Sequence, residues 1–104
     1  MSAKIVLPIR VKYRNSKTMN SMSLALSIEK IEDAENVISI DCSSNMLFTL
    51  PDLNFPNLIE FNCSNNYLSS LPAINCPKLE IFDCSNNKFK LPMKIKIKGI
   101  IINI

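Results

Sequence analysis

The sequence is poor in the residues on which most catalytic sites depend. Its 104 residues include no histidine and one glycine, Gly99. Without histidine the chain lacks the usual general base, the usual zinc ligand and the usual partner of a nucleophilic serine or cysteine. A single glycine leaves no glycine-rich loop for a phosphate. We therefore expect a protein that is not an enzyme and holds no cofactor or metal.

Long hydrophobic runs are also missing. The longest apolar stretch is shorter than the roughly 20 residues of a membrane span. The opening stretch at residues 5–9 is shorter than a signal-peptide core and lacks a cleavage pattern after it. A chain of this length forms one domain with a modest core. We expect an intracellular, cytoplasmic protein without a transmembrane segment.

Charge is distributed unevenly along the chain. Residues 1–17 carry five bases and no acid, whereas residues 18–92 hold all nine acids against four lysines, a net charge of −5 (four minus nine). The last twelve residues add three lysines. Basic ends of this kind bind either phosphates or an acidic protein surface. Because the bases are sparse and only Tyr13 lies among them for stacking, we expect protein partners rather than nucleic acid.

A repeat dominates the middle of the chain. Cys42, Cys63 and Cys84 follow one another at intervals of 21 residues. The segments 37–57, 58–78 and 79–92 share apolar positions before and after the cysteine, and a Leu-Pro pair ends the common pattern. Each also places an asparagine three residues after its cysteine, and these are Asn45, Asn66 and Asn87.

These segments resemble leucine-rich repeats, whose pattern is L-x-x-L-x-L-x-x-N-x-L. The short CSNNxLxxLP version is similar to repeats of protist, bacterial and large DNA virus proteins. The resemblance implies a solenoid of about three full repeats with degenerate repeats at its ends. Its concave side would be a short parallel β-sheet and its convex side turns or 3₁₀ segments. We divide the chain into a basic arm and loop (1–23), a degenerate first repeat or cap (24–36), the repeats (37–92) and a terminal apolar strand (93–104).

The alternation of side chains supports the same architecture on physical grounds. In Phe61-Asn62-Cys63 apolar and polar residues alternate, as in a half-buried strand. The apolar columns are buried only when successive repeats stack. Cysteine suits a buried column because it is small and behaves as a hydrophobe. The asparagines Asn45, Asn66 and Asn87 are expected to hydrogen-bond backbone groups of the turns that follow the strands.

Candidate sites follow from this stacking. Three cysteines in one column cannot surround a tetrahedral ion, so we expect buried reduced thiols rather than a zinc site. The sequon Asn62-Cys63-Ser64 falls inside a strand, and we regard it as a coincidence. One acid per strand on the concave side indicates either a solvated polar face or a surface for a basic partner. The candidate partner-binding residues on this face are Ser39, Asp41, Glu60, Asn62, Ile81 and Asp83.

The two ends of the chain carry unusual patterns. Apolar residues alternate in the N-terminal segment 5–13, which suits an edge strand because Pro8 interrupts it. Ile97, Ile100 and Ile102 restart the repeat's strand motif near the C-terminus. The two ends either pair with each other as a cap or add to the sheet of a neighbouring subunit. Residues 16–23 are polar and suit a loop, and residues 24–35 fit a short helix or a strand.

Size and composition direct the functional prediction. Three strands and a partial fourth span about 15–20 Å, which is too short to enclose a globular partner. We predict a small structural subunit of a larger assembly. The amino-acid composition is similar to that of proteins encoded by AT-rich genomes, including those of large DNA viruses. It therefore suggests a minor capsid component of a virion. The alternative is a free adaptor that holds a basic peptide on its concave face. The predicted assembly contacts are Arg10, Lys12, Arg14, Lys96, Ile100 and Ile102.

Overall fold

The chain folds into a small coil of β-strands in a computed structural model, which describes residues 9–14, 18–21, 28, 31–90 and 101–103. No helix among these residues is long and apolar enough to cross a membrane. The elements in chain order are β1 (Ile9–Tyr13), β2 (Thr18–Ser21), the 3₁₀ turn η2 (Ala34–Asn36), β3 (Val37–Asp41), β4 (Leu53–Asn54), β5 (Glu60–Asn62), β6 (Ile74–Asn75), β7 (Ile81–Asp83) and β8 (Ile101–Asn103).

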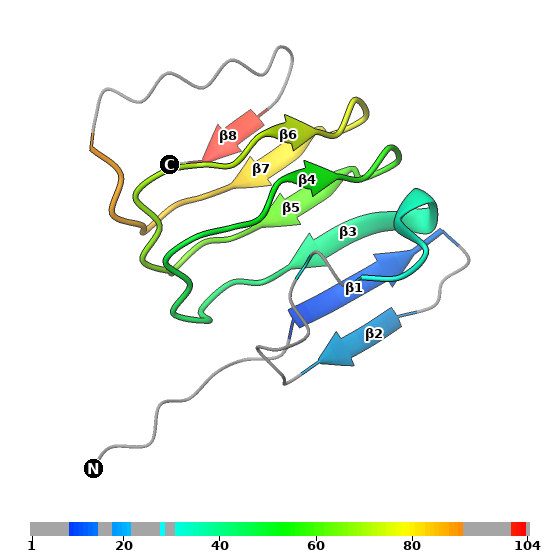
Figure 1. Cartoon of the computed structure of the whole chain (residues 1–104), viewed down its shortest axis with the longest axis horizontal. Helices are drawn as coiled ribbons and strands as arrows, with labels where there is room; N and C mark the ends of the chain where they lie inside the picture. Colours follow the sequence, from blue (N-terminus) through cyan, green and yellow to red (C-terminus); the bar gives the residue numbers. More distant parts are fainter. Residues whose placement is uncertain (1–8, 15–17, 22–27, 29–30, 91–100, 104) are drawn as a thin grey trace.

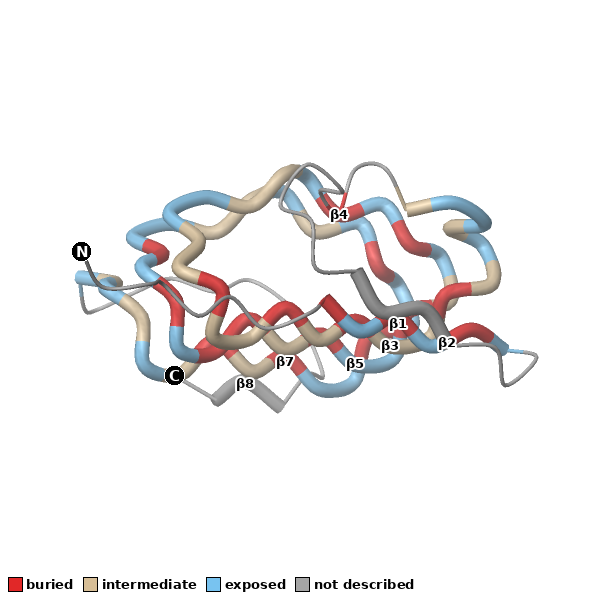
Figure 2. Tube along the Cα trace, turned by 90° about the horizontal axis from the view of Figure 1, so that it is seen from below, coloured by how far each residue is buried: buried red, intermediate tan, exposed pale blue. Residues whose placement is uncertain are grey.

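Two sheets form opposite sides of the stack of repeats. The larger has the strand order β2-β1-β3-β5-β7-β8, and the smaller joins β4 to β6 (Figure 1). Two successive laps, one repeat of 21 residues each, run from the larger sheet to the smaller sheet and back, and Figure 2 shows the larger sheet on one side and the return segments on the other. Strands β3, β5, β7 and β8 pair in parallel, one lap apart.

The 21-residue spacing determines which side chains stack in the core. Ile40 pairs in register with Phe61, which in turn pairs with Phe82. All three are buried, and the rings of Phe61 and Phe82 stack with centroids 5.4 Å apart. One lap cannot bury these side chains alone, because each needs the apolar residue of the next lap against it. The repeated apolar positions therefore form one continuous core.

The return side differs from the expected turns or 3₁₀ segments. Leu53 and Asn54 pair in parallel with Ile74 and Asn75, which makes a second short sheet. Side chains reinforce this pairing, since the Asn75 amide donates to the Asn54 amide oxygen over 2.9 Å. The reason is that laps in register bring equivalent extended residues side by side, where their backbone groups can bond.

The N-terminal segment forms a hairpin against the first repeat, and this corrects three expectations. Residues 18–21 are a strand, not a loop, and β1 lies inside the sheet because β2 takes the edge. Strand β1 runs antiparallel to both neighbours, so the larger sheet is mixed, not parallel. Its burial alternates, with Ile9, Val11 and Tyr13 inward. The hairpin thus covers the apolar end of the core.

The C-terminal strand extends the opposite end of the same sheet. Three intervening strands separate β1 from β8, so the described strands at the two ends do not pair with each other. Ile102 pairs with Phe82, and Asn103 pairs with Asp83. The expected motif placed Ile100 opposite Phe82, so that register was wrong by two residues. The observed register aligns Ile102 with the buried row of Phe82 and Asn103 with the half-buried row of Asp83.

Candidate functional site

The outer face of the larger sheet carries two rows of side chains, one row per register position. Ser39, Glu60 and Ile81 form the first row, and β1 adds Lys12 to it. The second row holds Asp41, Asn62 and Asp83, with Arg10 added by β1. Glu60 and Ile81 are exposed. All six concave residues predicted from the sequence therefore lie on neighbouring strands.

The second row also has a structural role within each lap. One carboxylate oxygen of Asp41 accepts hydrogen bonds from the Ser43 N–H (3.0 Å) and the Ser43 hydroxyl (2.6 Å). Asp83 and Ser85 repeat this arrangement at 3.1 and 2.7 Å. In the middle lap the amide oxygen of Asn62 replaces the carboxylate. The side chains of the second row therefore stabilise the turns that follow the strands. Some of their oxygen atoms already accept hydrogen bonds from within the chain.

Arg10 is engaged within the chain. Its guanidinium lies 2.7 Å from the other carboxylate oxygen of Asp41. Burial alone would raise the pKa of Asp41, but the hydrogen bonds from Ser43 and the charge of Arg10 together hold this pKa below its usual value. The basic strand β1 thus occupies one end of the acidic row.

The other predicted assembly contacts are distributed differently. Lys12 and Arg14 are exposed, and Ile102 takes part in the pairing of β8 with β7. Lys96 and Ile100 lie outside the described residues. The structure therefore places Arg10 and Ile102 in contacts within the chain and leaves two basic side chains facing solvent.

The three column cysteines lie directly after β3, β5 and β7 and are buried. Backbone bonds continue the sheet through them, since the Cys42 N–H donates to the Asn62 carbonyl and the Cys63 N–H to the Asp83 carbonyl, both over 2.8 Å. Burial raises the pKa of Cys42 to about 12 and that of Cys84 to about 11, and it also raises the pKa of Cys63. Thiols held neutral in this way are poor nucleophiles. Across the described ranges, no three cysteine or acidic side chains are grouped to hold a metal ion.

An inward ladder of asparagine amides joins the laps beside this column. The Asn66 amide oxygen accepts the backbone N–H groups of Asn45 and Leu47, each over 2.9 Å. Its amide nitrogen donates to three carbonyls, those of Cys42, Cys63 and Ser64. Asn87 repeats the pattern one lap on, accepting from Leu68 and donating to the carbonyls of Cys63, Cys84 and Ser85. Each amide therefore bonds to its own lap and to the preceding one.

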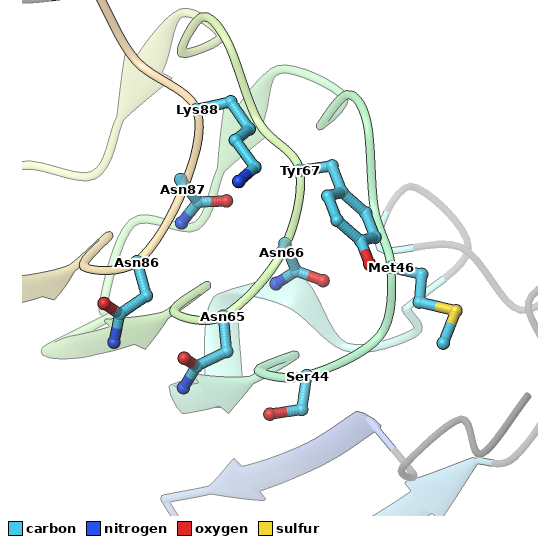
Figure 3. Close-up of a pocket in the computed structure, with 8 residues that line it drawn as sticks. All are labelled: Ser44, Met46, Asn65, Asn66, Tyr67, Asn86, Asn87 and Lys88. Carbon is cyan, nitrogen blue, oxygen red and sulfur yellow. The ribbon is translucent and has the colours of Figure 1, made fainter.

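A groove that the repeat pattern did not predict lies beyond the carboxyl ends of the strands. Its floor includes Asn66 and Asn87, and its walls include Tyr67 and Lys88 (Figure 3). Beside it, the ring of Phe48 stacks on Tyr67. A signal was present, because Phe48 and Tyr67 are aromatic residues at positions that the repeat leaves variable. Aromatic residues outside the apolar columns of a repeat are expected to be exposed.

Comparison with known families agrees with this geometry. Residues 56–92 match the family model described as Leucine Rich repeats (2 copies). The matched segment is thus similar to leucine-rich repeats, and the lap before it has the same register in the structure. Domains of this family generally mediate protein–protein interaction and are typically non-catalytic. Comparisons with curated proteins and with solved structures gave no significant match.

Proposed function

We propose that this protein is a small structural subunit that joins its neighbours by extension of the larger sheet. The observation that carries the proposal is the position of β8. It pairs with β7 along one edge, and none of the described strands lies along its other edge. An open edge presents backbone N–H and C=O groups that a strand of another chain can pair with.

The dimensions of the molecule favour such lateral packing. Its principal extents are 41 × 33 × 17 Å. The outer face of three repeats is too short to surround a globular partner, whereas an edge needs only one strand from a neighbour. The composition suggests a virus particle as the setting, in which the protein would be a minor capsid component made inside the cell.

Proline substitutions in β8 test this proposal. Alternate N–H groups of a strand point to opposite neighbours, so proline blocks outward pairing only where the N–H points away from β7. We would prepare Ile101→Pro, Ile102→Pro and Asn103→Pro and compare their masses by native mass spectrometry with that of the unchanged chain. We expect the unchanged chain to form oligomers. The variant whose proline replaces an N–H that points away from β7 should be a monomer with an unaltered melting temperature. A monomeric unchanged chain at all concentrations would contradict the proposal.

A specific contact favours a second candidate function, a free adaptor that binds a basic strand on the outer face. The Arg10–Asp41 pair shows how a basic strand can lie against the acidic row. Glu60 and Asp83 remain further along the two rows, and Glu60 is exposed. A basic peptide could pair its side chains with these acids in the same manner.

A peptide copied from residues 9–14 is a suitable probe for this second candidate. We would measure its binding to the unchanged chain and to a variant with both Glu60→Gln and Asp83→Asn. The middle lap already uses Asn62 in the role of Asp83, so the variant keeps the turn. Glu35→Lys, an exposed change outside both rows, serves as the control. Loss of binding in the double variant alone supports the adaptor, and equal binding by all three proteins argues against it.

A further inference from the structure

The groove beyond the carboxyl ends of β3, β5 and β7 is a separate surface from the sheet face and its edges. It has a volume of about 490 Å³. Ser44, Asn65 and Asn86 occupy equivalent positions of successive laps along it, and all three have positive φ angles of 57°, 55° and 54°. This left-handed conformation suits asparagine better than most residues. It turns the backbone sharply after each strand and so creates the row.

Three of the polar side chains that line the groove differ from the bonded asparagines and aspartates of the repeats. Inward asparagines, the strand-end Asp and Asn residues and the return-side Asn54 and Asn75 all bond to the protein. In contrast, the side chains of Asn65, Asn86 and Lys88 have no bonding partner within the described part of the chain. Figure 3 shows all three along the groove, with the Lys88 side chain reaching toward its middle. They supply donors and acceptors that the fold itself does not use.

An aromatic pair stands beside these polar groups. The rings of Phe48 and Tyr67 stack with centroids 5.3 Å apart and an interplanar angle of 21°. Phe48 is 69% exposed and Tyr67 is 43% exposed, the two highest exposures among the large hydrophobic residues that the structure describes. The two rings pack against each other and both remain exposed. Exposed aromatic residues are typical of the anchoring points of protein interfaces.

The charge of the groove limits what it can bind. Lys88 is among its lining residues, and no acidic residue lines it. The outer face of the sheet is the opposite, because Glu60 and Asp83 lie there. The two surfaces should therefore attract partners of opposite charge. A partner for the groove needs an anionic group for Lys88, an apolar group for the aromatic pair, and polar groups for the two amides.

We propose that the groove binds an extended acidic peptide segment that carries an aromatic or large aliphatic side chain. A carboxylate of the peptide pairs with the Lys88 ammonium group. The apolar side chain packs against Phe48 and Tyr67. Backbone N–H and C=O groups of the peptide bond to Asn65 and Asn86, whose amides both donate and accept. This inference rests on the interaction role of the repeats and not on the assembly through β8.

A fluorescent peptide in which glutamates flank two phenylalanines is the probe. Matched peptides replace its glutamates by lysines or its phenylalanines by alanines, and an uncharged oligosaccharide and an oligothymidylate are also tested. The protein variants are Lys88→Glu, Phe48→Ala and Lys90→Glu. Lys90→Glu is the control because it gives the same change in net charge and lies outside the lining. Fluorescence anisotropy, or competition for the peptide, measures the affinities.

We expect the acidic aromatic peptide to bind at least about tenfold more tightly than either matched peptide. Lys88→Glu and Phe48→Ala should each weaken it by about tenfold, and Lys90→Glu should leave it within about twofold. Equal losses for Lys88→Glu and Lys90→Glu would reduce the effect to net charge and overturn the proposal. Preferred binding of the oligosaccharide or the oligothymidylate would overturn it as well, and so would the absence of binding by every probe. None of these outcomes depends on the oligomeric state, because β8 is unchanged in all variants.

Discussion

Neighbouring asparagines in the second lap have opposite roles. Asn66 is buried and makes five hydrogen bonds, which join its own lap to the preceding one. Asn65 is exposed, adopts a left-handed conformation and faces the groove. The same pair of residues recurs as Asn86 and Asn87. One amide of each pair therefore specifies how laps stack, and the other specifies the surface that the stack presents.

The difference shows that residue type alone does not determine a residue's role in this repeat. The inward position of the second lap requires an amide, because Asn66 accepts from two N–H groups and donates to carbonyls of two laps. The outward position requires only a residue that tolerates a positive φ angle, and Ser44 fills it in the first lap. Substitutions at the two positions should accordingly have very different effects.

Removal of the inward amide should give the largest effect. We expect Asn66→Ala to lower the free energy of unfolding by about 3 kcal/mol, because one buried and one half-buried N–H donor lose their acceptor at once. Urea denaturation measures this loss. Asn65→Gly is the matched control, since glycine keeps the left-handed conformation, and its effect should stay within about 0.5 kcal/mol. Similar losses in the two variants would refute the division of roles.

Alkaline pH should weaken the column that lies beside the ladder. The pKa of Cys42 in the folded protein is about 12, above the value of about 8.5 for an unfolded chain. The stabilising contribution of the neutral thiol is therefore complete below about pH 8.5 and is lost as the pH rises toward the folded value. Between about pH 8 and pH 10 we expect a loss of about 2 kcal/mol from this thiol. Cys42→Ala should make this part of the pH profile less steep, while the other buried thiols still contribute to it, and an unchanged slope would contradict the assignment.

The first amide of the ladder should matter less than the second. Asn45 donates to the carbonyls of Cys42 and Ser43, but its buried amide oxygen has no partner among the described residues. Asn45→Ala removes that unsatisfied acceptor together with the two bonds, so part of the loss is offset. We expect Asn45→Ala to lower the free energy of unfolding, measured by urea denaturation, by about 1 kcal/mol. This loss is well below that of Asn66→Ala. A cost equal to that of Asn66→Ala would show that the bonds between laps carry no extra stability.

The smallest expected change lies at Met46, two residues after the outward residue Ser44. Met46 has a φ angle of 59°, a conformation that is unfavourable for a residue with a long side chain. Met46→Gly should therefore raise the free energy of unfolding by about 0.5 kcal/mol. Thermal denaturation with Asn65→Gly for comparison checks this, because asparagine already tolerates the conformation. A lower stability for Met46→Gly would mean that the loss of side-chain packing outweighs the relief of the unfavourable φ angle.

The repeated part of the fold was predictable from the sequence because its cause is periodic. Residues 21 positions apart pair in register, so Cys42, Cys63 and Cys84 align as the spacing requires. The ends were not predictable in the same way. The pairing of β1 with β3 depends on a contact between segments that share no repeat, and β8 pairs with β7 at a spacing of 20 residues, not the 21 of the repeats.

Part of the candidate site was also visible in the sequence. The sheet face follows from the alternation in each strand, and all six predicted residues lie on it. The groove does not follow from alternation. It arises because left-handed residues bend the chain after each strand and bring Tyr67 and Lys88, one lap apart, to the same surface. Hydropathy patterns carry no information on such a bend.

The ladder of inward amides gives this architecture a simple route for modular growth. The central segment 58–78 both receives the amide of the following lap and offers its own amide to the preceding one. A tandem duplication of that segment would insert a lap whose upper and lower bonding surfaces already match those of its new neighbours. The length of the molecule can therefore change in single steps while both terminal strands keep their environments.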